Sequence, residues 1–231
     1  HVRSRRQRQM CIRDRSYGEL NRKANQLARR LRERGVQAGT TAAILIARSA
    51  EMVIGILAVL KAGGAYVPID PDHPEKRMQH FFEDSGAAVL LTQKAMKPLA
   101  EAAEFGGDIL FLEDEQLYMG DASDLRLPIS PEAMANLTYT SGTTGTPKGN
   151  MVSHRNILRT VKNTNYLDVM TSDIVLSISN YVFDAFMFDV FGSLLNGAKL
   201  VIAPKDTILD MSRLAHVLEK EKVTVLSLIH I

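Results

Sequence analysis

Cysteine and tryptophan are nearly absent from this chain, whose 231 residues include one cysteine and no tryptophan. The single cysteine, Cys11, lies in an N-terminal stretch that we treat below as non-native. A chain without other cysteines has no disulfide framework and no metal–thiolate site, which suits a reducing compartment. We therefore expect the protein to be cytoplasmic.

Long hydrophobic runs are also missing. The longest apolar run extends from Met52 to Leu60 and is interrupted by Gly55, whereas a membrane-spanning helix needs about 20 apolar residues. No signal-peptide pattern is present, so we expect no association with a membrane. The hydrophobic fraction of 45% is ample for a packed core, so we expect a globular protein.

Charge is distributed unevenly along the chain. The formal net charge is +2, and residues 1–15 carry six arginines against one acidic residue, so they contribute +5 and the remainder −3. A basic arm can contact nucleic acid. This one has no periodicity and no aromatic residue for base stacking, so we expect no nucleic-acid partner.

The two ends of the chain have another explanation. Residues 6–15 and the ending 226–231 resemble translated read-through of a sequencing adaptor. We therefore divide the chain into non-native residues 1–15, a native segment 16–225 and non-native residues 226–231, and leave both tails out of the fold prediction.

Helical and strand patterns alternate along the native segment. Ser16 to Glu19 fits a capping box that starts a helix ending at Gly35, and Gly63 and Gly86 stop two further helices. The predicted strands are 41–47, 65–69, 88–92, 109–112, 134–139, 174–179, 200–203 and 223–225; the predicted helices after the first are 51–62, 74–85, 94–104, 184–196 and 209–220. This rhythm predicts an α/β fold with mostly parallel strands, flanked by helices and arranged in more than one sheet.

A run of glycines and hydroxyl side chains, residues 140–149, reads TSGTTGTPKG. Glycines at 142, 145 and 149 let the backbone turn its N–H groups toward an anion, and Lys148 adds a positive charge. The GxxxxGK[ST] spacing of the common P-loop is absent, which disfavours a nucleoside triphosphatase of the Walker type. A predicted strand precedes the run, and Ser153 to Asn156 opens a helical pattern, so we expect a phosphate loop between strand and helix.

This run resembles the phosphate-loop signature of adenylate-forming enzymes, [ST]-G-[ST]-T-G-x-P-K-G. Residues 16–20 (SYGEL) and 60–71 (LKAGGAYVPIDP) are similar to the first and second core motifs of amino-acid adenylation domains of nonribosomal peptide synthetases. The resemblance covers Ser16 to Val225 and implies the N-terminal large subdomain of the adenylate-forming fold. Departures are Asn150, where a hydrophobic residue is usual, and His73, where an aromatic residue is common.

Residues 183–191 (FDAFMFDVF) resemble the family's substrate-pocket helix, whose Phe-Asp pair, here Phe183 and Asp184, opens the amino-acid site. On a helix, Asp184, Ala185 and Phe188 share a face, while Met187, Val190 and Phe191 are expected to pack elsewhere. An aspartate in an apolar wall requires a cation, and the resemblance implies the substrate's α-ammonium. The alternative is that Asp184 is a helix N-cap. The apolar face predicts a hydrophobic amino-acid substrate.

The resemblance also implies the reaction. An amino-acid carboxylate attacks the α-phosphate of MgATP, and the thiol of a phosphopantetheinyl carrier domain then takes the acyl group. It assigns the ATP phosphates to Thr140, Ser141, Gly142, Thr143, Thr144, Gly145 and Lys148. The Mg²⁺ carboxylate and the catalytic lysine are expected beyond this chain, so none of its residues is assigned as catalytic. His154 is expected to be structural rather than a metal ligand.

Two alternatives remain open from the sequence. One is a fragment of a carboxylic-acid–CoA ligase, which shares the phosphate loop but has no ammonium to bind. The other is a non-catalytic nucleotide-binding module. In each case we expect the 231-residue chain to be inactive alone.

Overall fold

The computed structural model describes residues 15–140 and 147–227. Up to residue 153 the elements are α2 (Tyr17–Arg32), β1 (Thr41–Leu45), α3 (Ala50–Ala62), β2 (Ala65–Pro68), α4 (Glu75–Ser85), β3 (Val89–Thr92), η1 (Lys94–Met96), α5 (Lys97–Ala102), β4 (Asp108–Phe111), η2 (Glu115–Tyr118), β5 (Met134–Thr140) and β6 (Lys148–Ser153). The rest of the chain forms α6 (His154–Val161), β7 (Ile174–Ser177), α7 (Asp184–Met187), the π-helical turn η3 (Phe188–Gly192), β8 (Lys199–Ile202), α8 (Lys205–Ile208), α9 (Met211–Glu221) and β9 (Val225–Leu226).

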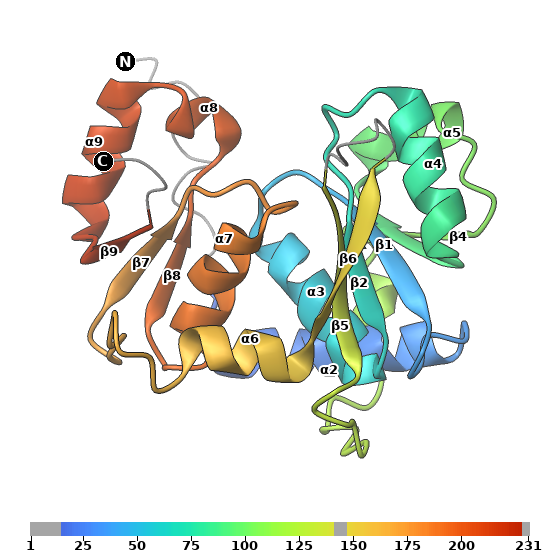
Figure 1. The fold of residues 1–231 in the computed structure, drawn as a ribbon, viewed down its shortest axis with the longest axis horizontal. Coiled ribbons are helices and arrows are strands. Elements are labelled where there is room, and N and C mark those ends of the chain that lie inside the picture. The colour runs from blue at the N-terminus through green and yellow to red at the C-terminus, as the bar shows by residue number, and fades with distance from the viewer. Residues whose placement is uncertain (1–14, 141–146, 228–231) are drawn as a thin grey trace.

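Two sheets organise the molecule (Figure 1). The larger has six strands in the order β4-β3-β1-β2-β5-β6, and the smaller has three in the order β8-β7-β9. Every neighbouring pair is parallel except β5 and β6. The prediction of an α/β fold with mostly parallel strands in more than one sheet is confirmed.

Helices cover both faces of the larger sheet, which explains why its central strands are mostly apolar and buried. Every residue of β1 is buried. One face packs against α4 and α5 through a cluster that includes Leu45, Val67 and Phe81. The other packs against α2 and α3, and this second cluster continues into α7 through Phe186 and into η3 through Phe191. Figure 1 shows α3 between the two sheets and α6 running across the lower part of both.

Local signals determine several helix ends as predicted. The Ser16 hydroxyl accepts the Glu19 N–H, and the Glu19 carboxylate accepts the Ser16 N–H, which is a complete capping box. Gly63 ends α3 with φ of 94°, a conformation in which a side chain would be strained. Gly86 ends α4 in the same left-handed region, at φ of 61°.

Several parts of the chain differ from their predictions. The helix predicted for 209–220 begins two residues later, as α9, because the Asp210 carboxylate accepts the N–H groups of Ser212 and Arg213. The short helix α8 before it was not predicted. The helix predicted for 184–196 changes to a π-helical turn at Phe188. Residues 148–153 form a strand, β6, that was not predicted. Leu226, which was assigned above to a non-native tail, lies in β9 and pairs with Leu176 of β7.

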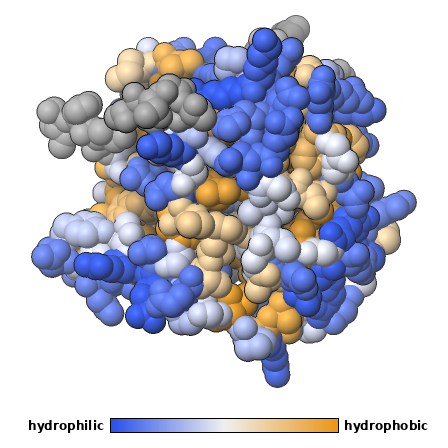
Figure 2. Space-filling view, turned by 45° about the vertical axis from the view of Figure 1, so that its right-hand side comes forward, coloured by the Kyte–Doolittle hydropathy of each residue, from blue (hydrophilic) through white to orange (hydrophobic). Residues whose placement is uncertain are grey.

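The face shown in Figure 2 is mainly hydrophilic, with apolar residues gathered along its middle and lower part. Exposed apolar side chains include Met151, Leu209 and Met211, each more than 70% exposed. Among the helices that the structure describes, none is long and apolar enough to cross a membrane.

Candidate functional site

The glycine- and hydroxyl-rich run connects the two strands of an antiparallel hairpin. Thr140 at the end of β5 pairs with Lys148 at the start of β6, and both are exposed. The predicted phosphate contacts Ser141, Gly142, Thr143, Thr144 and Gly145 lie outside the described residues. The structure therefore places two of the predicted phosphate contacts side by side, at the two ends of the loop.

The predicted order of strand, loop and helix is wrong, because β6 intervenes before α6. Residues 148–153 are exposed or half-buried along an edge of the sheet, so they carry no alternation of apolar and polar residues that would indicate a strand. Gly149 has a packing role here: a Cβ atom would lie 2.9 Å from Leu137 Cδ1. A larger residue at this position would require the Leu137 side chain to move, whether or not a phosphate is bound.

Tyr139, the residue before Thr140, anchors the base of the hairpin to α4. Its ring stacks on Phe81 with centroids 4.2 Å apart, and its hydroxyl donates to Asp84 Oδ2 at 2.6 Å. Burial and the Asp84 carboxylate both raise the pKa of Tyr139. Sequence analysis missed this anchor, because its partners lie more than 50 residues earlier in the chain.

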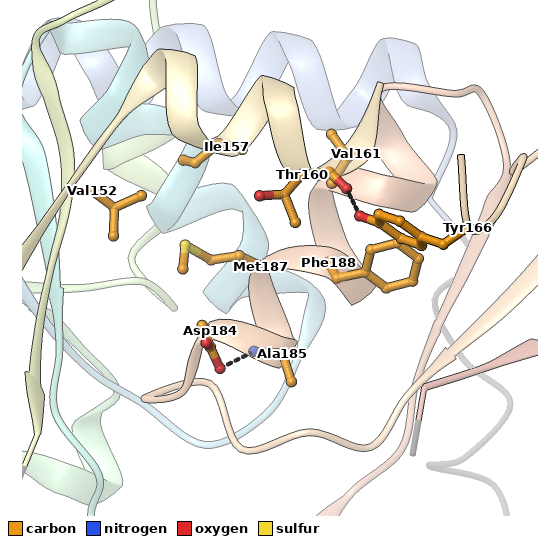
Figure 3. Close-up of a pocket in the computed structure, with 9 residues that line it drawn as sticks. All are labelled: Val152, Ile157, Thr160, Val161, Tyr166, Asp184, Ala185, Met187 and Phe188. Atoms are coloured by element: carbon orange, nitrogen blue, oxygen red, sulfur yellow. Dashed lines mark hydrogen bonds between the residues drawn. The ribbon is translucent and has the colours of Figure 1, made fainter. Parts of the chain in front are cut away.

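A cavity of about 340 Å³ lies beside the hairpin, between β6, α6 and α7 (Figure 3). Its lining comes from four parts of the chain: Val152, Ile157, Thr160, Val161, Tyr166, Asp184, Ala185, Met187 and Phe188. The Tyr166 ring lies against Phe188, with centroids 6.4 Å apart, and its hydroxyl donates to the Thr160 carbonyl oxygen. The wall opposite Asp184 is therefore apolar, apart from the Thr160 and Tyr166 hydroxyl groups.

The structure brings Asp184, Ala185 and Phe188 to this one cavity. Met187 also lines it, so the prediction that Met187 packs elsewhere is wrong. Phe183 is 56% exposed and is not among the lining residues. Sequence analysis missed Val152, Thr160 and Tyr166, because nothing in their local pattern links them to the helix at 184.

Asp184 differs from its prediction in one respect. We expected a carboxylate in an apolar wall, but Asp184 is exposed at the edge of the cavity, and its Oδ1 accepts the Ala185 N–H at 2.8 Å. The N-cap alternative is also wrong, because Phe183 occupies the N-cap and Asp184 is the first helical residue. Water can therefore solvate this carboxylate, and it carries no large desolvation cost in the structure described.

His154 is half-buried at the start of α6. It lines a second cavity of about 330 Å³ between α2, α3, α6 and η3. Burial lowers the pKa of His154, which favours the neutral ring. No group of three or more His, Cys, Asp or Glu side chains comes together among the described residues. His154 thus has the neighbours of a packing residue, and we assign no residue of the described ranges to Mg²⁺.

The Lys148 side chain is available to bind an anion. Within residues 15–140 and 147–227, no carboxylate lies within ion-pair distance of its ammonium group. Together with the exposed Thr140 hydroxyl, it offers a positive charge and a donor at the mouth of the hairpin. These two residues fit a nucleotide phosphate.

Comparisons with known proteins place this geometry in context. The family described as AMP-binding enzyme matches residues 3–229. Surfactin synthase subunit 1 of Bacillus subtilis (strain 168) is 63% identical over 211 residues, which cover 91% of this chain and 6% of that protein. Gramicidin S synthase 2 of Brevibacillus brevis is 44% identical over 91% of this chain and 5% of its own length.

Solved structures agree with the sequence relatives. The nonribosomal peptide synthetase FmoA3, bound to alpha-methyl-L-serine-AMP, has a TM-score of 0.81 at 31% identity, covering 90% of this chain and 23% of that one. The Klebsiella oxytoca NpsA N-terminal subdomain, in complex with 3-hydroxybenzoyl-AMSN, also has a TM-score of 0.81 at 29% identity, covering 94% and 54%. This chain thus spans a small part of the curated relatives it matches.

Proposed function

The chain belongs to the family of AMP-binding enzymes, and from this membership we propose that it is part of an adenylation domain that activates an amino acid with ATP in nonribosomal peptide synthesis. The observation that carries the proposal is the placement of the phosphate hairpin beside a cavity lined by Asp184, Ala185 and Phe188. The 63% identity to a surfactin synthase subunit supports it.

The reaction requires the two substrates to meet between the hairpin and the cavity. The amino-acid carboxylate attacks the α-phosphorus of ATP, the bond to the β-phosphate oxygen breaks, and pyrophosphate leaves. Thr140 and Lys148 hold the β- and γ-phosphates, together with the predicted contacts Ser141, Gly142, Thr143, Thr144 and Gly145. Their contribution is positioning and stabilisation of negative charge.

The second half-reaction transfers the acyl group to a carrier domain. The phosphopantetheine thiol attacks the acyl carbon of the adenylate and AMP leaves, which forms a thioester. We assign no residue of this chain to that step. The cysteine-poor composition is consistent with a cytoplasmic enzyme.

The cavity lining supports a hydrophobic amino acid as substrate. Ile157, Val161 and Phe188 present apolar surface, and among the lining residues Asp184 is the one charged side chain. Asp184 pairs with the α-ammonium group of the substrate, which leaves the apolar wall to the side chain. Phe183 stays a proposed substrate contact that acts from outside the cavity lining.

A carboxylic-acid–CoA ligase is the second candidate, and one observation favours it. Asp184 is exposed and bonded to its own helix, and the related NpsA subdomain binds a 3-hydroxybenzoyl group, which has no α-ammonium. In this second proposal, the cavity takes an acid without an amino group.

One experiment separates the two candidates. Pyrophosphate exchange is measured in the full-length enzyme that contains this chain, with valine, leucine, lysine, glutamate and 3-methylbutanoate, the des-amino analogue of valine. We expect valine or leucine to be activated best. Asp184→Asn should lower activation of either by about 10-fold or more, because it removes a charge-assisted pair of about 1.5–3 kcal/mol.

The result that rejects the proposal is equal activation of 3-methylbutanoate and valine by the unmodified enzyme, since the ammonium group would then contribute nothing. Lys148→Ala serves as a second probe. It should weaken use of ATP with every acid, because its charge contacts the shared substrate. An unchanged KM for ATP would remove Lys148 from the phosphate site.

We also propose that residues 16–225 are the native segment and that residues 1–15 and 226–231 are not. Two contacts cross these boundaries: Arg15 lies 3.0 Å from Glu51, and Leu226 pairs with Leu176. Sequencing the flanking DNA decides the matter. An uninterrupted reading frame that encodes both tails as printed would reject the proposed boundaries.

A further inference from the structure

Arg48, between β1 and α3, reaches from the larger sheet to the smaller one. Its guanidinium group donates to the carbonyl oxygens of Ser177 at 2.6 Å, of Ala203 at 3.0 Å and of Ser179, and to the Ser177 hydroxyl at 2.9 Å. These acceptors lie at or just beyond the carboxyl ends of the adjacent parallel strands β7 and β8. One side chain therefore joins two strand ends of the smaller sheet to the larger sheet.

Asp189 lies beside these Arg48 contacts, in the π-helical turn η3, whose first residue, Phe188, lines the cavity. It is fully buried, and its Oδ2 accepts the Ser179 N–H at 3.4 Å. Arg48 and Asp189 therefore bind the same residue, because Arg48 donates to the Ser179 carbonyl oxygen and Asp189 accepts the Ser179 N–H. Asp189 directly follows Phe188, which lines the cavity, so the position of one constrains the other.

The helix that contains Asp189 has an irregular backbone geometry. Residues Phe188–Gly192 form a π-helical turn, a rare geometry that is common at functional sites. The Arg48 guanidinium also lies 5.9 Å from the ring of Phe186, one turn before Val190 on the same helix. Arg48 thus contacts the cavity helix through the face opposite its substrate side.

A second set of contacts, made by Tyr181, holds the loop that precedes α7. The buried Tyr181 hydroxyl donates to the carbonyl oxygen of Ile69, which follows β2, and accepts the Ile46 N–H at 3.4 Å. Its ring meets Phe186 edge-on, with centroids 6.1 Å apart. The whole segment from Ser177 to Asp189 is therefore held against the ends of β1 and β2.

We propose that Arg48 and Asp189 are positioning residues that hold the helix at 184–192 against the larger sheet and thereby determine the shape of the acid-binding cavity. Neither lines the cavity, so neither contacts the substrate directly. Because β5 and the phosphate hairpin belong to the same larger sheet, the pair also keeps the cavity in register with the nucleotide. This inference rests on the proposed function.

The guanidinium fork is essential to this role. Three carbonyl oxygens and a hydroxyl group accept from Arg48 in fixed directions, which a planar fork with five N–H donors matches and a lysine ammonium does not. Arg48→Lys keeps the charge beside Asp189 but loses part of this set. The strand ends and the helix are then free to shift, and misplacement of a substrate by about 1 Å can lower a rate by about 100-fold.

The test uses the full-length enzyme with Arg48→Lys and a matched control, Lys205→Met. Lys205 pairs with Asp72 across the same boundary between the sheets, but the pair is exposed and lies away from the cavity lining. For Arg48→Lys we expect the KM for the amino acid to rise by about 10-fold or more, with the KM for ATP changed by less than about twofold. Both values should stay unchanged in the control.

A second variant covers the case in which Arg48→Lys does not fold. Ser177→Ala removes one hydroxyl group, which accepts from Arg48 and interacts with Asp189. This variant should fold, with a smaller rise in the KM for the amino acid. A merely structural role predicts lower thermal stability in both variants with unchanged KM values. That outcome would overturn the inference, as would equal increases in both KM values.

Hydrogen–deuterium exchange provides a readout that does not require activity. Peptides covering residues 179–192 should exchange faster in Arg48→Lys than in the unmodified enzyme, and at the unmodified rate in Lys205→Met. If no amino acid is activated but the exchange rates change as expected, the proposed function is wrong and the positioning role of Arg48 and Asp189 is upheld. Unchanged exchange rates in Arg48→Lys refute this positioning role, whatever the activity of the enzyme.

Discussion

The buried carboxyl group of Asp189 should make the stability of this fold depend on pH in an unusual direction. Burial is the largest influence on this group and raises its pKa from 3.8 to about 6, although hydrogen bonds from Ser179 and Ser177 and the charge of Arg48 act in the opposite sense. Each pKa unit corresponds to about 1.4 kcal/mol, so ionisation of Asp189 costs the folded state about 3 kcal/mol relative to the unfolded chain.

The sign follows from proton binding. Between about pH 4 and pH 6 the folded state retains a proton that the unfolded state has released, so the free energy of unfolding falls as pH rises through this window. Above about pH 6 both states are ionised at this position and the decline stops. Arg48 stays charged throughout, and burial raises the pKa of Tyr181 far from this range.

The perturbation is Asp189→Asn, which keeps the size of the side chain and removes its titration. The free energy of unfolding of the adenylation domain is measured by urea denaturation, followed by circular dichroism, at intervals from pH 4 to pH 7. Relative to the variant, the unmodified domain should lose about 2–3 kcal/mol of stability across this range.

Asp121 provides a control of opposite sign. Hydrogen bonds from Ser123, followed by Arg29, lower the pKa of Asp121 to about 2. Its stabilisation is therefore present above pH 3.8 and is lost as pH falls toward 2, so Asp121→Asn should differ from the unmodified domain by a constant amount between pH 5 and pH 7. If Asp189→Asn also shows a constant difference over pH 4 to 7, the reasoning about Asp189 is refuted.

Three further predictions concern packing, capping and substrate size. Ser16→Ala removes the side-chain acceptor of the capping box and should cost about 1 kcal/mol, read as a fall of about 2–4 °C in thermal midpoint; no fall would show that the cap contributes nothing. Gly64→Ala should cost about 1–3 kcal/mol, because its Cβ would lie 2.6 Å from Val36 Cγ1. Gly18→Ala, whose Cβ meets nothing closer than 3.9 Å, should be tolerated, and equal losses in the two glycine variants would contradict the steric argument. Phe188→Ala enlarges the cavity and should shift pyrophosphate exchange from valine and leucine toward phenylalanine, whereas an unchanged preference would remove Phe188 from the substrate site.

Helix boundaries and motif spacing were predictable because they depend on neighbours in the sequence. Ser16 and Glu19 satisfy each other three residues apart, and Gly63 adopts its left-handed conformation within a single turn. The alternation of helices and strands likewise implied parallel sheets, since parallel strands need a crossover between them. The resemblance to adenylation domains rested on the same local patterns and is confirmed by the family match.

Strand β6 was not predictable in this way. Its six residues are exposed or half-buried, and what makes them a strand is the hydrogen bonding to β5 that begins at Thr140 and Lys148. A short edge strand gains its stability from its partner rather than from its own sequence. The phosphate loop was therefore placed correctly after a strand but wrongly before a helix.

By itself, the sequence determined the residue types of the site: a loop rich in hydroxyls and glycines that ends in Lys148, and a helix that begins Asp184-Ala185 and continues to Phe188. Only the tertiary structure decided that Met187 faces the cavity, that Asp184 is exposed, and that Arg48 binds the strand end at Ser177, 129 residues away. Local hydrogen bonds and backbone preferences are encoded over a few residues. The burial of a charge and the shape of a cavity depend on which distant side chains surround them, and no pattern within one element records those neighbours.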